Sequence, residues 1–252
     1  MKTAVITGAS SGLGVDFFSA VAEHYPEVEE IWLIARRKER LEKLAKRYEK
    51  VKIRALGLDL ADEASYRQLE ELLEKEKPQI RILVNNAGVC KSGKFGERTL
   101  EELFMMVNLN IKGSTAMARL CLPYMEKGGI AVFTSSVSSF VPIAGQGVYS
   151  STKSYLTYLG RALHEEWKSE GIHVCVLCPG NMATEMNPID VEKASKSKIG
   201  KLPYLDTRKV AVETLKRAEK GKACYTPGRF YLAYQAAGKI LPHSFMMKLN
   251  RL

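Results

Sequence analysis

The sequence has no long hydrophobic run. No apolar stretch in its 252 residues approaches the roughly 18 residues that a membrane-spanning helix needs. The first ten residues, MKTAVITGAS, carry only a short apolar run before a glycine loop. They lack the hydrophobic core and the small-residue cleavage site of a secretory signal. We therefore expect a cytoplasmic protein.

Cysteine and histidine are few and scattered. The five cysteines are an odd, dispersed set that does not fit a disulfide framework, and the four histidines do not have the spacing of a metal site. Cys175 and Cys178 form a CxxC inside IHVCVLCPG, a run typical of a buried strand, on which positions three apart face opposite sides. A redox or zinc pair is the alternative, but we expect two small buried side chains and no metal.

Acidic residues are scarce toward the C-terminal end. Residues 1–190 hold 24 Lys or Arg and 24 Asp or Glu, whereas residues 191–252 hold 14 and 4. The formal net charge of +10 therefore lies entirely in the second segment. A localised charge indicates a local partner, but no motif of a nucleic-acid-binding protein accompanies it, and we expect no nucleic acid partner.

Short apolar, β-branched runs alternate with longer amphipathic stretches along the whole chain. Near-continuous apolar strands separated by helices are typical of a parallel sheet covered on both faces. No Pro-, Gly- or Ser-rich linker divides the chain, so we predict one doubly wound α/β domain over residues 1–252. The predicted strands are 3–7, 31–35, 51–58, 80–86, 130–136, 172–178 and 223–225, and the predicted helices are 12–24, 38–49, 62–76, 99–126, 149–170 and 206–220.

A glycine loop lies between the first predicted strand and the first predicted helix. In TGASSGLG, the glycines are Gly8, Gly12 and Gly14. Small residues let the backbone approach a pyrophosphate, and the N-terminus of the following helix then faces the negative charge. The alternative is a tight turn without a ligand. The position at the start of a strand–helix–strand unit favours a dinucleotide site.

The second predicted strand ends in IWLIARR. A site specific for NAD normally carries an acidic residue there for the ribose 2′-hydroxyl, but here the residues are Ala35, Arg36 and Arg37, and the first carboxylate is Glu39. Guanidinium groups suit a 2′-phosphate. NADP(H) is therefore favoured over NAD(H), unless both arginines are only solvated loop residues.

A tyrosine stands four positions before a lysine in GVYSSTK, as Tyr149 and Lys153. On a helix these side chains share one face. A phenol with a pKa near 10 is a poor acid–base catalyst unless a nearby ammonium lowers that pKa, so we expect Lys153 to lower the pKa of Tyr149. Tyr155 and Tyr158 lack such a lysine, and we assign them to packing.

Six motifs in register resemble those of the classical short-chain dehydrogenases/reductases. TGASSGLG is similar to their cofactor loop, Asp59 in LGLDL to the acidic residue near adenine, and NNAG at 85–88 to the motif after the fourth strand. Ser136 with Tyr149 and Lys153 resembles their catalytic set, and CPG at 178–180 with Thr184 resembles the segment beside nicotinamide. The resemblance implies a Rossmann fold and an oxidoreductase. Ser11 departs from it, because many NADP-preferring members carry a basic residue there.

The resemblance also implies roles for the residues. Tyr149 is the general acid/base, Ser136 donates to the substrate oxygen, and Lys153 holds the nicotinamide ribose. An asparagine holds a proton-relay water, and the NxKG register in VNLNIKG favours Asn110, with Asn108 as the alternative. The residues expected to bind the cofactor are Gly8, Ser10, Ser11, Gly12, Leu13, Gly14, Arg36, Arg37, Asp59, Leu60, Asn86, Ala87, Gly88, Tyr149, Lys153, Pro179, Gly180 and Thr184.

Family members build the substrate pocket from the loop after the sixth strand and from the C-terminus, here residues 181–205 and 226–252. These segments are rich in Met, Phe and Tyr, so we expect an apolar ketone or alcohol such as a steroid, a bile acid or an acyl compound. The alternatives are a dinucleotide-binding redox sensor and a membrane-surface protein with vestigial catalysis. The resemblance further implies a homodimer or homotetramer through 99–126 and 149–170. The basic, amphipathic C-terminal segment could instead contact a subunit, cover the pocket or lie on an anionic membrane.

Overall fold

A seven-stranded sheet forms the centre of the computed structural model, which describes residues 1–48, 50–186 and 202–249. All strand pairs are parallel, in the order β3-β2-β1-β4-β5-β6-β7. The predicted fold class is confirmed. The strands are β1 (Lys2–Thr7), β2 (Glu30–Ala35), β3 (Lys52–Gly57), β4 (Gln79–Asn85), β5 (Met125–Thr134), β6 (His173–Leu177) and β7 (Cys224–Tyr225).

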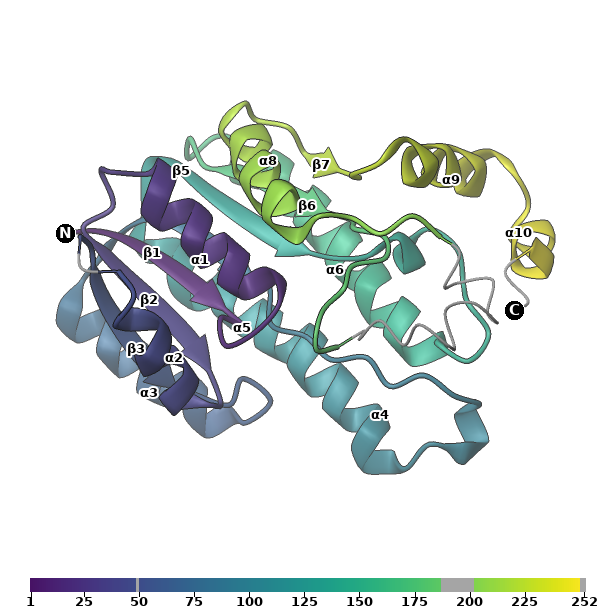
Figure 1. Cartoon of the computed structure of the whole chain (residues 1–252), viewed down its shortest axis with the longest axis horizontal. Coiled ribbons are helices and arrows are strands. Elements are labelled where there is room, and N and C mark those ends of the chain that lie inside the picture. Colours follow the sequence, from purple (N-terminus) through teal and green to yellow (C-terminus); the bar gives the residue numbers. More distant parts are fainter. Residues whose placement is uncertain (49, 187–201, 250–252) are drawn as a thin grey trace.

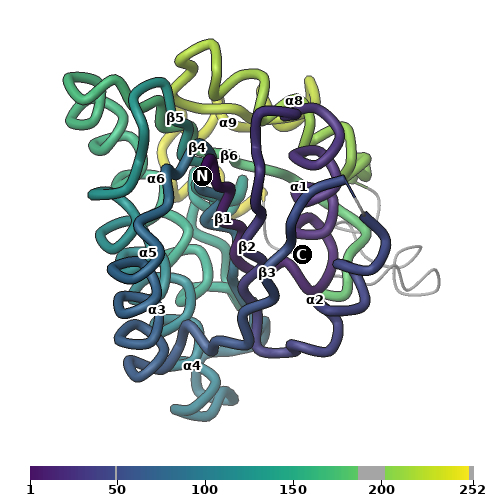
Figure 2. Tube along the Cα trace, turned by 90° about the vertical axis from the view of Figure 1, so that its left-hand side faces the viewer, coloured from purple at the N-terminus to yellow at the C-terminus, as the bar shows by residue number. Residues whose placement is uncertain are grey.

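Helices cover both faces of the sheet, and each layer encloses its own apolar core (Figure 2). In β1 the buried side chains of Ala4 and Ile6 belong to one core and that of Val5 to the other, because successive strand residues point to opposite faces. The helices of the first layer are α1 (Leu13–His24), α2 (Lys38–Ala45) and α8 (Thr207–Glu219), and those of the second are α3 (Glu63–Glu76), α4 (Leu100–Val107), α5 (Ser114–Cys121) and α6 (Gly147–Glu166).

The predicted helix over 99–126 is wrong as one continuous element. Its start is correct, since Thr99 and Glu102 form the expected capping box before α4. A π-helical turn then separates α4 from α5 at Asn108–Gly113, and after α5 the chain passes through a short 3-10 turn into β5 at Met125. A π turn adds one residue to a helix without changing the apolar pattern on either side, so the sequence pattern does not indicate it.

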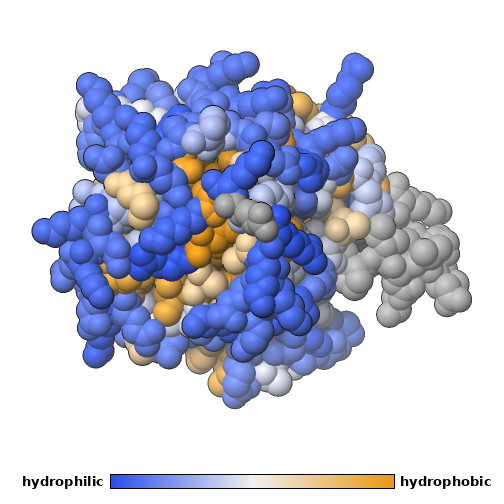
Figure 3. Space-filling model, turned by 60° about the vertical axis from the view of Figure 1, so that its left-hand side comes forward, coloured by the Kyte–Doolittle hydropathy of each residue, from blue (hydrophilic) through white to orange (hydrophobic). Residues whose placement is uncertain are grey.

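Two helices follow β7 and form the C-terminal part of the chain, α9 (Arg229–Ile240) and α10 (His243–Leu249) (Figure 1). Pro242 lies between them. Tyr231 is buried, whereas Ile240 and Leu249 are exposed. No helix within the described ranges is long and apolar enough to cross a membrane. The face of the molecule in Figure 3 is largely hydrophilic, with apolar side chains gathered near its centre.

The connections of the sheet change direction between β1 and β4, which are neighbours. From β1 the chain continues through β2 to β3 on one side, and from β4 it continues through β5 to β7 on the other. In doubly wound sheets, ligands bind beyond the carboxyl ends of the strands at such a point. This topology places the segments that follow the strands along one edge.

Candidate active site

A cavity of about 700 Å³ lies along the carboxyl edge of the sheet. It is lined by the segments that follow β1 to β6. Of the predicted site residues, only Gly14 and Asn110 do not line it. Those that do are Gly8, Ser10, Ser11, Gly12, Leu13, Arg36, Arg37, Asp59, Leu60, Asn86, Ala87, Gly88, Ser136, Tyr149, Lys153, Pro179, Gly180 and Thr184.

The glycine loop needs its glycines for conformation and for close packing. Gly8 and Gly12 have φ angles of 66° and 54°, which favour glycine. A Cβ on Gly8 would lie 2.9 Å from the Cα of Ala87, and one on Gly14 would overlap the carbonyl of Gly8. Gly14 therefore acts outside the cavity wall, by letting α1 pack directly against the loop.

Thr7 joins the glycine loop to the segment after β4. Its Oγ1 accepts hydrogen bonds from the backbone N–H groups of Asn86 and Ala87, both at 2.9 Å, and donates to the carbonyl of Val84. The Asn86 side chain donates to the Thr7 carbonyl at 3.2 Å. These bonds hold two walls of the cavity in register.

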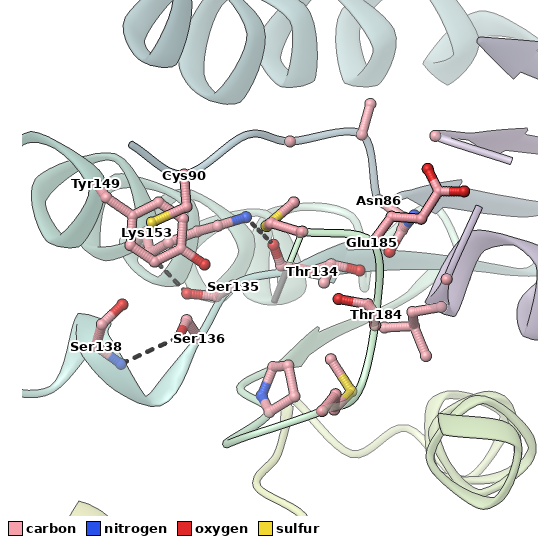
Figure 4. A pocket seen from close by; sticks show the side chains of 18 of the residues that line it. Asn86, Cys90, Thr134, Ser135, Ser136, Ser138, Tyr149, Lys153, Thr184 and Glu185 are labelled. Carbon is pink, nitrogen blue, oxygen red and sulfur yellow. Dashed lines mark hydrogen bonds between the residues drawn. The ribbon is translucent and has the colours of Figure 1, made fainter. Parts of the chain in front are cut away.

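Tyr149 and Lys153 lie together at one end of the site, with Cys90 beside them (Figure 4). Helix α6 carries both, one turn apart as predicted, and the Lys153 Nζ lies 5.7 Å from the centroid of the Tyr149 ring. That Nζ donates to the carbonyl of Thr134 at 2.8 Å. The Ser136 Oγ accepts from the Ser138 backbone N–H at 3.2 Å, which leaves the hydroxyl proton of Ser136 for another acceptor.

The expectation that Lys153 lowers the pKa of Tyr149 is not met. Burial raises the pKa of Tyr149, and only a hydrogen bond with Ser136 opposes this. Burial also lowers the pKa of Lys153 to about 8. The ammonium donates to the Thr134 carbonyl and lies over the face of the Tyr149 ring, and desolvation of the phenol is the largest influence on its pKa.

Asn110 sits in the π turn and is fully buried. Its amide group accepts from the Val89 N–H at 2.8 Å and donates to the Val89 carbonyl at 2.9 Å and to the Thr152 Oγ1 at 3.0 Å. A Cβ on Gly88 would lie 3.3 Å from both the Asn110 Oδ1 and the Lys153 Nζ. Asn110 therefore borders the catalytic end, as predicted, while Asn108 is only half-buried.

The end of β2 holds a cluster of charged residues that the sequence indicated only in part. Arg36 and Arg37 are exposed and line the cavity, and their contact with a 2′-phosphate stays a prediction. Glu185, which was not predicted, forms ion pairs with Arg37 and with Arg40. Its position directly after Thr184 could have indicated a site residue, but nothing in the sequence predicted that Glu185 lies beside α2.

Five charged residues line the cavity among the described residues. They are Lys153, Asp59 after β3, and Arg36, Arg37 and Glu185 of the cluster just described, and the rest of the described lining carries no charge. Cys90 lines the cavity, and residues of the predicted substrate loop and C-terminal cap do so too, although 187–201 and 250–252 lie outside the described ranges. The side chains that line this part are Ser92, Val137, Ile143, Gln146, Met182, Met186, Leu202, Phe230, Tyr231, Tyr234, Met246 and Leu249.

The cysteines and acidic residues form no metal site in the part of the chain that is described. No group of three or more His, Cys, Asp or Glu side chains there could hold an ion. Cys175 and Cys178 are both fully buried, as expected for small core side chains. Cys178 lies beside Cys224 of β7, not beside Cys175.

Comparisons with known proteins agree with this geometry. A family model described as short chain dehydrogenase matches residues 2–194. Oxidoreductase UcpA of Salmonella typhimurium is 32% identical over 190 residues, 73% of this chain and 71% of that protein. The very-long-chain 3-oxoacyl-CoA reductase-A of Danio rerio is 34% identical over 75% of this chain, which spans only 60% of that protein. A short-chain dehydrogenase from Sphingobium yanoikuyae, solved in complex with NADPH, superposes with a TM-score of 0.77 at 26% identity and covers 100% of this chain and 96% of its own.

Proposed function

The chain belongs to the short-chain dehydrogenase family, and we propose that it is an NADP(H)-dependent oxidoreductase that interconverts a secondary alcohol and a ketone. The proposal depends on one observation. Tyr149, Ser136 and Lys153 line one end of the cavity whose other end carries the glycine loop and Arg37. Acid–base groups and an anion-binding cluster therefore share one continuous space.

The residues present fit a nicotinamide dinucleotide. A Cβ on Gly8 or Gly12 would crowd Ala87 or Thr184, so only glycines allow this tight loop, and the loop opens into α1, whose N-terminus attracts phosphate. Asp59, Asn86 and Gly88 follow the adjacent strands and would hold the adenosine and the nicotinamide half. When bound, the dinucleotide supplies or accepts the hydride.

The acid–base groups suit carbonyl reduction. The raised pKa of Tyr149 keeps its phenol protonated at neutral pH, so it can donate its proton to an oxygen that is becoming an alkoxide. Ser136 stabilises that oxygen with its remaining hydroxyl proton. Lys153 uses one N–H on Thr134 and would turn the others toward the ribose and the proton-relay path. In oxidation the same groups act in reverse, with Tyr149 accepting the proton.

The lining of the catalytic end supports an apolar, uncharged reacting group. Met182, Met186, Phe230 and Met246 line the cavity that contains this end, and methionine adapts to irregular apolar ligands. The relative that is named for very-long-chain 3-oxoacyl compounds supports an acyl-like ketone among the candidate substrates, beside steroids and bile acids. A redox sensor would not need all three of the acid–base side chains, which argues against that alternative.

The test is oxidation of NADPH and NADH by the purified protein against steroid, bile-acid, acyl and short aliphatic ketones, with Tyr149→Phe beside wild type. We expect turnover with NADPH, and a loss of about 10²- to 10⁴-fold in kcat for the variant, as for removal of a general acid. The dissociation constant for NADPH, measured by nicotinamide fluorescence, should change little.

Tyr158→Phe is the matched control, since it removes the same hydroxyl from an exposed position on the same helix. It should keep wild-type kcat. Activity of Tyr149→Phe close to that of the control would show that this phenol is not the acid. Faster turnover with NADH than with NADPH would refute the cofactor preference.

A further inference from the structure

A single carboxylate, that of Glu185, lies within the positive cluster that follows β2. Its Oε2 accepts from both terminal nitrogens of Arg37, each at 3.1 Å, and its Oε1 accepts from Arg40 at 2.5 Å. The same Arg37 side chain also donates to the hydroxyl oxygens of Ser10 and Ser11, at 3.2 and 3.3 Å. Two guanidinium groups from the start of α2 therefore hold the Glu185 carboxylate, and Arg37 also links this pair to the glycine loop.

This arrangement resembles a phosphate site with a carboxylate in it. Guanidinium groups bind carboxylate and phosphate oxygens in the same forked geometry. Ser10, Ser11, Arg37 and Glu185 line the cavity that contains the glycine loop, and they do so at the end of β2, where a dinucleotide presents its ribose 2′ substituent.

We propose that Glu185 and Arg40 are specificity-determining residues. The Glu185 carboxylate occupies the place of the 2′-phosphate of NADP(H). When NADP(H) binds, its 2′-phosphate displaces this carboxylate and contacts Arg40 as a second guanidinium beside Arg37. The inference rests on the NADP(H) preference proposed above. It adds that Glu185 competes with the 2′-phosphate for Arg37, and that Arg40, which lies outside the Arg36–Arg37 motif after β2, also binds the phosphate.

The two anions cannot share these donors. A carboxylate and a phosphate within a few ångströms repel each other, and the hydrogen bonds from Arg40 and Arg37 hold the pKa of Glu185 below its usual value, so the carboxylate is charged at neutral pH. The pairs are weak enough to be displaced, because the side chains of Arg37, Arg40 and Glu185 are 44%, 46% and 53% exposed and exposed pairs contribute little.

The residues on either side of Glu185 also line the cavity. Thr184 packs against Gly12, where an added Cβ would lie 3.2 Å from its side chain, and Met186 lines the cavity on the other side of Glu185. The half-exposed Glu185 side chain can therefore leave the two arginines by rotating toward solvent, while Thr184 stays packed against Gly12. NAD(H), which has no 2′-phosphate, leaves the ion pairs intact.

The opposite role for Glu185 makes a different prediction. A carboxylate at this point could accept the ribose 2′-hydroxyl of NAD(H), as acidic residues do in NAD-specific sites. In that case removal of the charge weakens NADH binding. The competitor role instead strengthens the binding of 2′-phosphorylated ligands and leaves NADH unaffected.

The experiment measures dissociation constants by calorimetry for NADPH, NADH, ADP and adenosine 2′,5′-bisphosphate, with wild type, Glu185→Gln and Arg40→Gln. We expect Glu185→Gln to bind NADPH and the bisphosphate about three- to fivefold more tightly, the scale of an exposed ion pair, with NADH within twofold of wild type. Arg40→Gln should weaken NADPH and the bisphosphate about tenfold, as for loss of a charge-assisted contact.

Glu42→Gln is the matched control, because it removes the same charge from α2 at an exposed carboxylate that pairs with Lys38. Tightening by Glu185→Gln no greater than by this control, or NADH binding weakened more than threefold, overturns the inference. A wild type that binds NADH more tightly than NADPH refutes the cofactor preference separately. In that case the dissociation constant of the bisphosphate alone tests the role of Glu185. Tighter binding of the bisphosphate by Glu185→Gln supports the inference, and unchanged binding overturns it.

Discussion

Lys153 is a buried lysine in surroundings that disfavour its charge. It is 3% exposed, and burial lowers its pKa to about 8 from an ordinary 10.5. Between these two pH values the unfolded chain holds a proton that the folded protein has released, so the free energy of unfolding rises with pH across this window. Relative to Lys153→Met, which cannot titrate, we expect wild type to gain about 2–3 kcal/mol between pH 7 and pH 10. Urea unfolding at several pH values measures this difference.

Lys209→Met is the control for that pH series, because its side chain is 87% exposed on α8. The difference between wild type and this control should not depend on pH over the same range. A flat difference for Lys153→Met as well would mean that the buried amine keeps its ordinary pKa and that the Thr134 carbonyl compensates for burial.

Single residues were predictable where a motif carries them and unpredictable where only folding brings them together. Tyr149, Ser136 and Lys153 line one cavity, as the resemblance to short-chain dehydrogenases implied. The direction of the Tyr149 pKa shift was wrong, since sequence spacing shows that a lysine is near but not that its ammonium faces a carbonyl. Glu185 is 148 positions from Arg37, and no local pattern joins them.

The π turn between α4 and α5 fixes the position of Asn110, and the amide of Asn110 in turn holds the segment after β4. We expect Asn110→Ala to lower the free energy of unfolding by about 2–4 kcal/mol, because the N–H and carbonyl of Val89 and the Thr152 hydroxyl lose a buried partner. Asn108→Ala, in the same turn but half-buried, should cost less than about 1 kcal/mol. Equal losses in urea unfolding would show that Asn110 has no special structural role.

Elements with strong periodicity were predictable, but their ends and interruptions were not. All seven strands are present near the predicted positions, because β-branched runs between amphipathic stretches have few other solutions. The segment predicted as a helix over 38–49 ends at Ala45, and β5 begins at Met125, five residues before the predicted strand. The residues 125–129 include two glycines and charged side chains, a composition that carries no strand signal of its own.

At the scale of the whole molecule, the excess positive charge lies in one segment, whereas exposed apolar side chains occur both inside and outside that segment. The acidic and basic residues of 1–190 balance, and the excess belongs to 191–252. Large exposed apolar side chains occur both there, as at Ile240, and on the helices of the second layer, as at Phe104 and Tyr158. The assignment of Tyr158 to packing within the chain is therefore wrong, since it is 78% exposed. The contact of the basic C-terminal segment with a subunit or a membrane stays a prediction.

The exposed aromatic side chains of α4 and α6 favour self-association through these two helices and not through the C-terminal segment. Helices α4 and α6 contact each other, and Phe104 and Tyr158 are 58% and 78% exposed on them. We expect these two aromatic side chains to lie in a two-fold interface, where each copy buries the same surface. We expect light scattering after size exclusion to give a multiple of 28.1 kDa for wild type and the single-chain mass for Phe104→Glu with Tyr158→Glu.

Ile240→Glu, at an 81% exposed position on α9, should keep the wild-type mass. Dissociation by Ile240→Glu alone would place the subunit contact at the C-terminal helices instead, and a monomeric wild type would refute self-association.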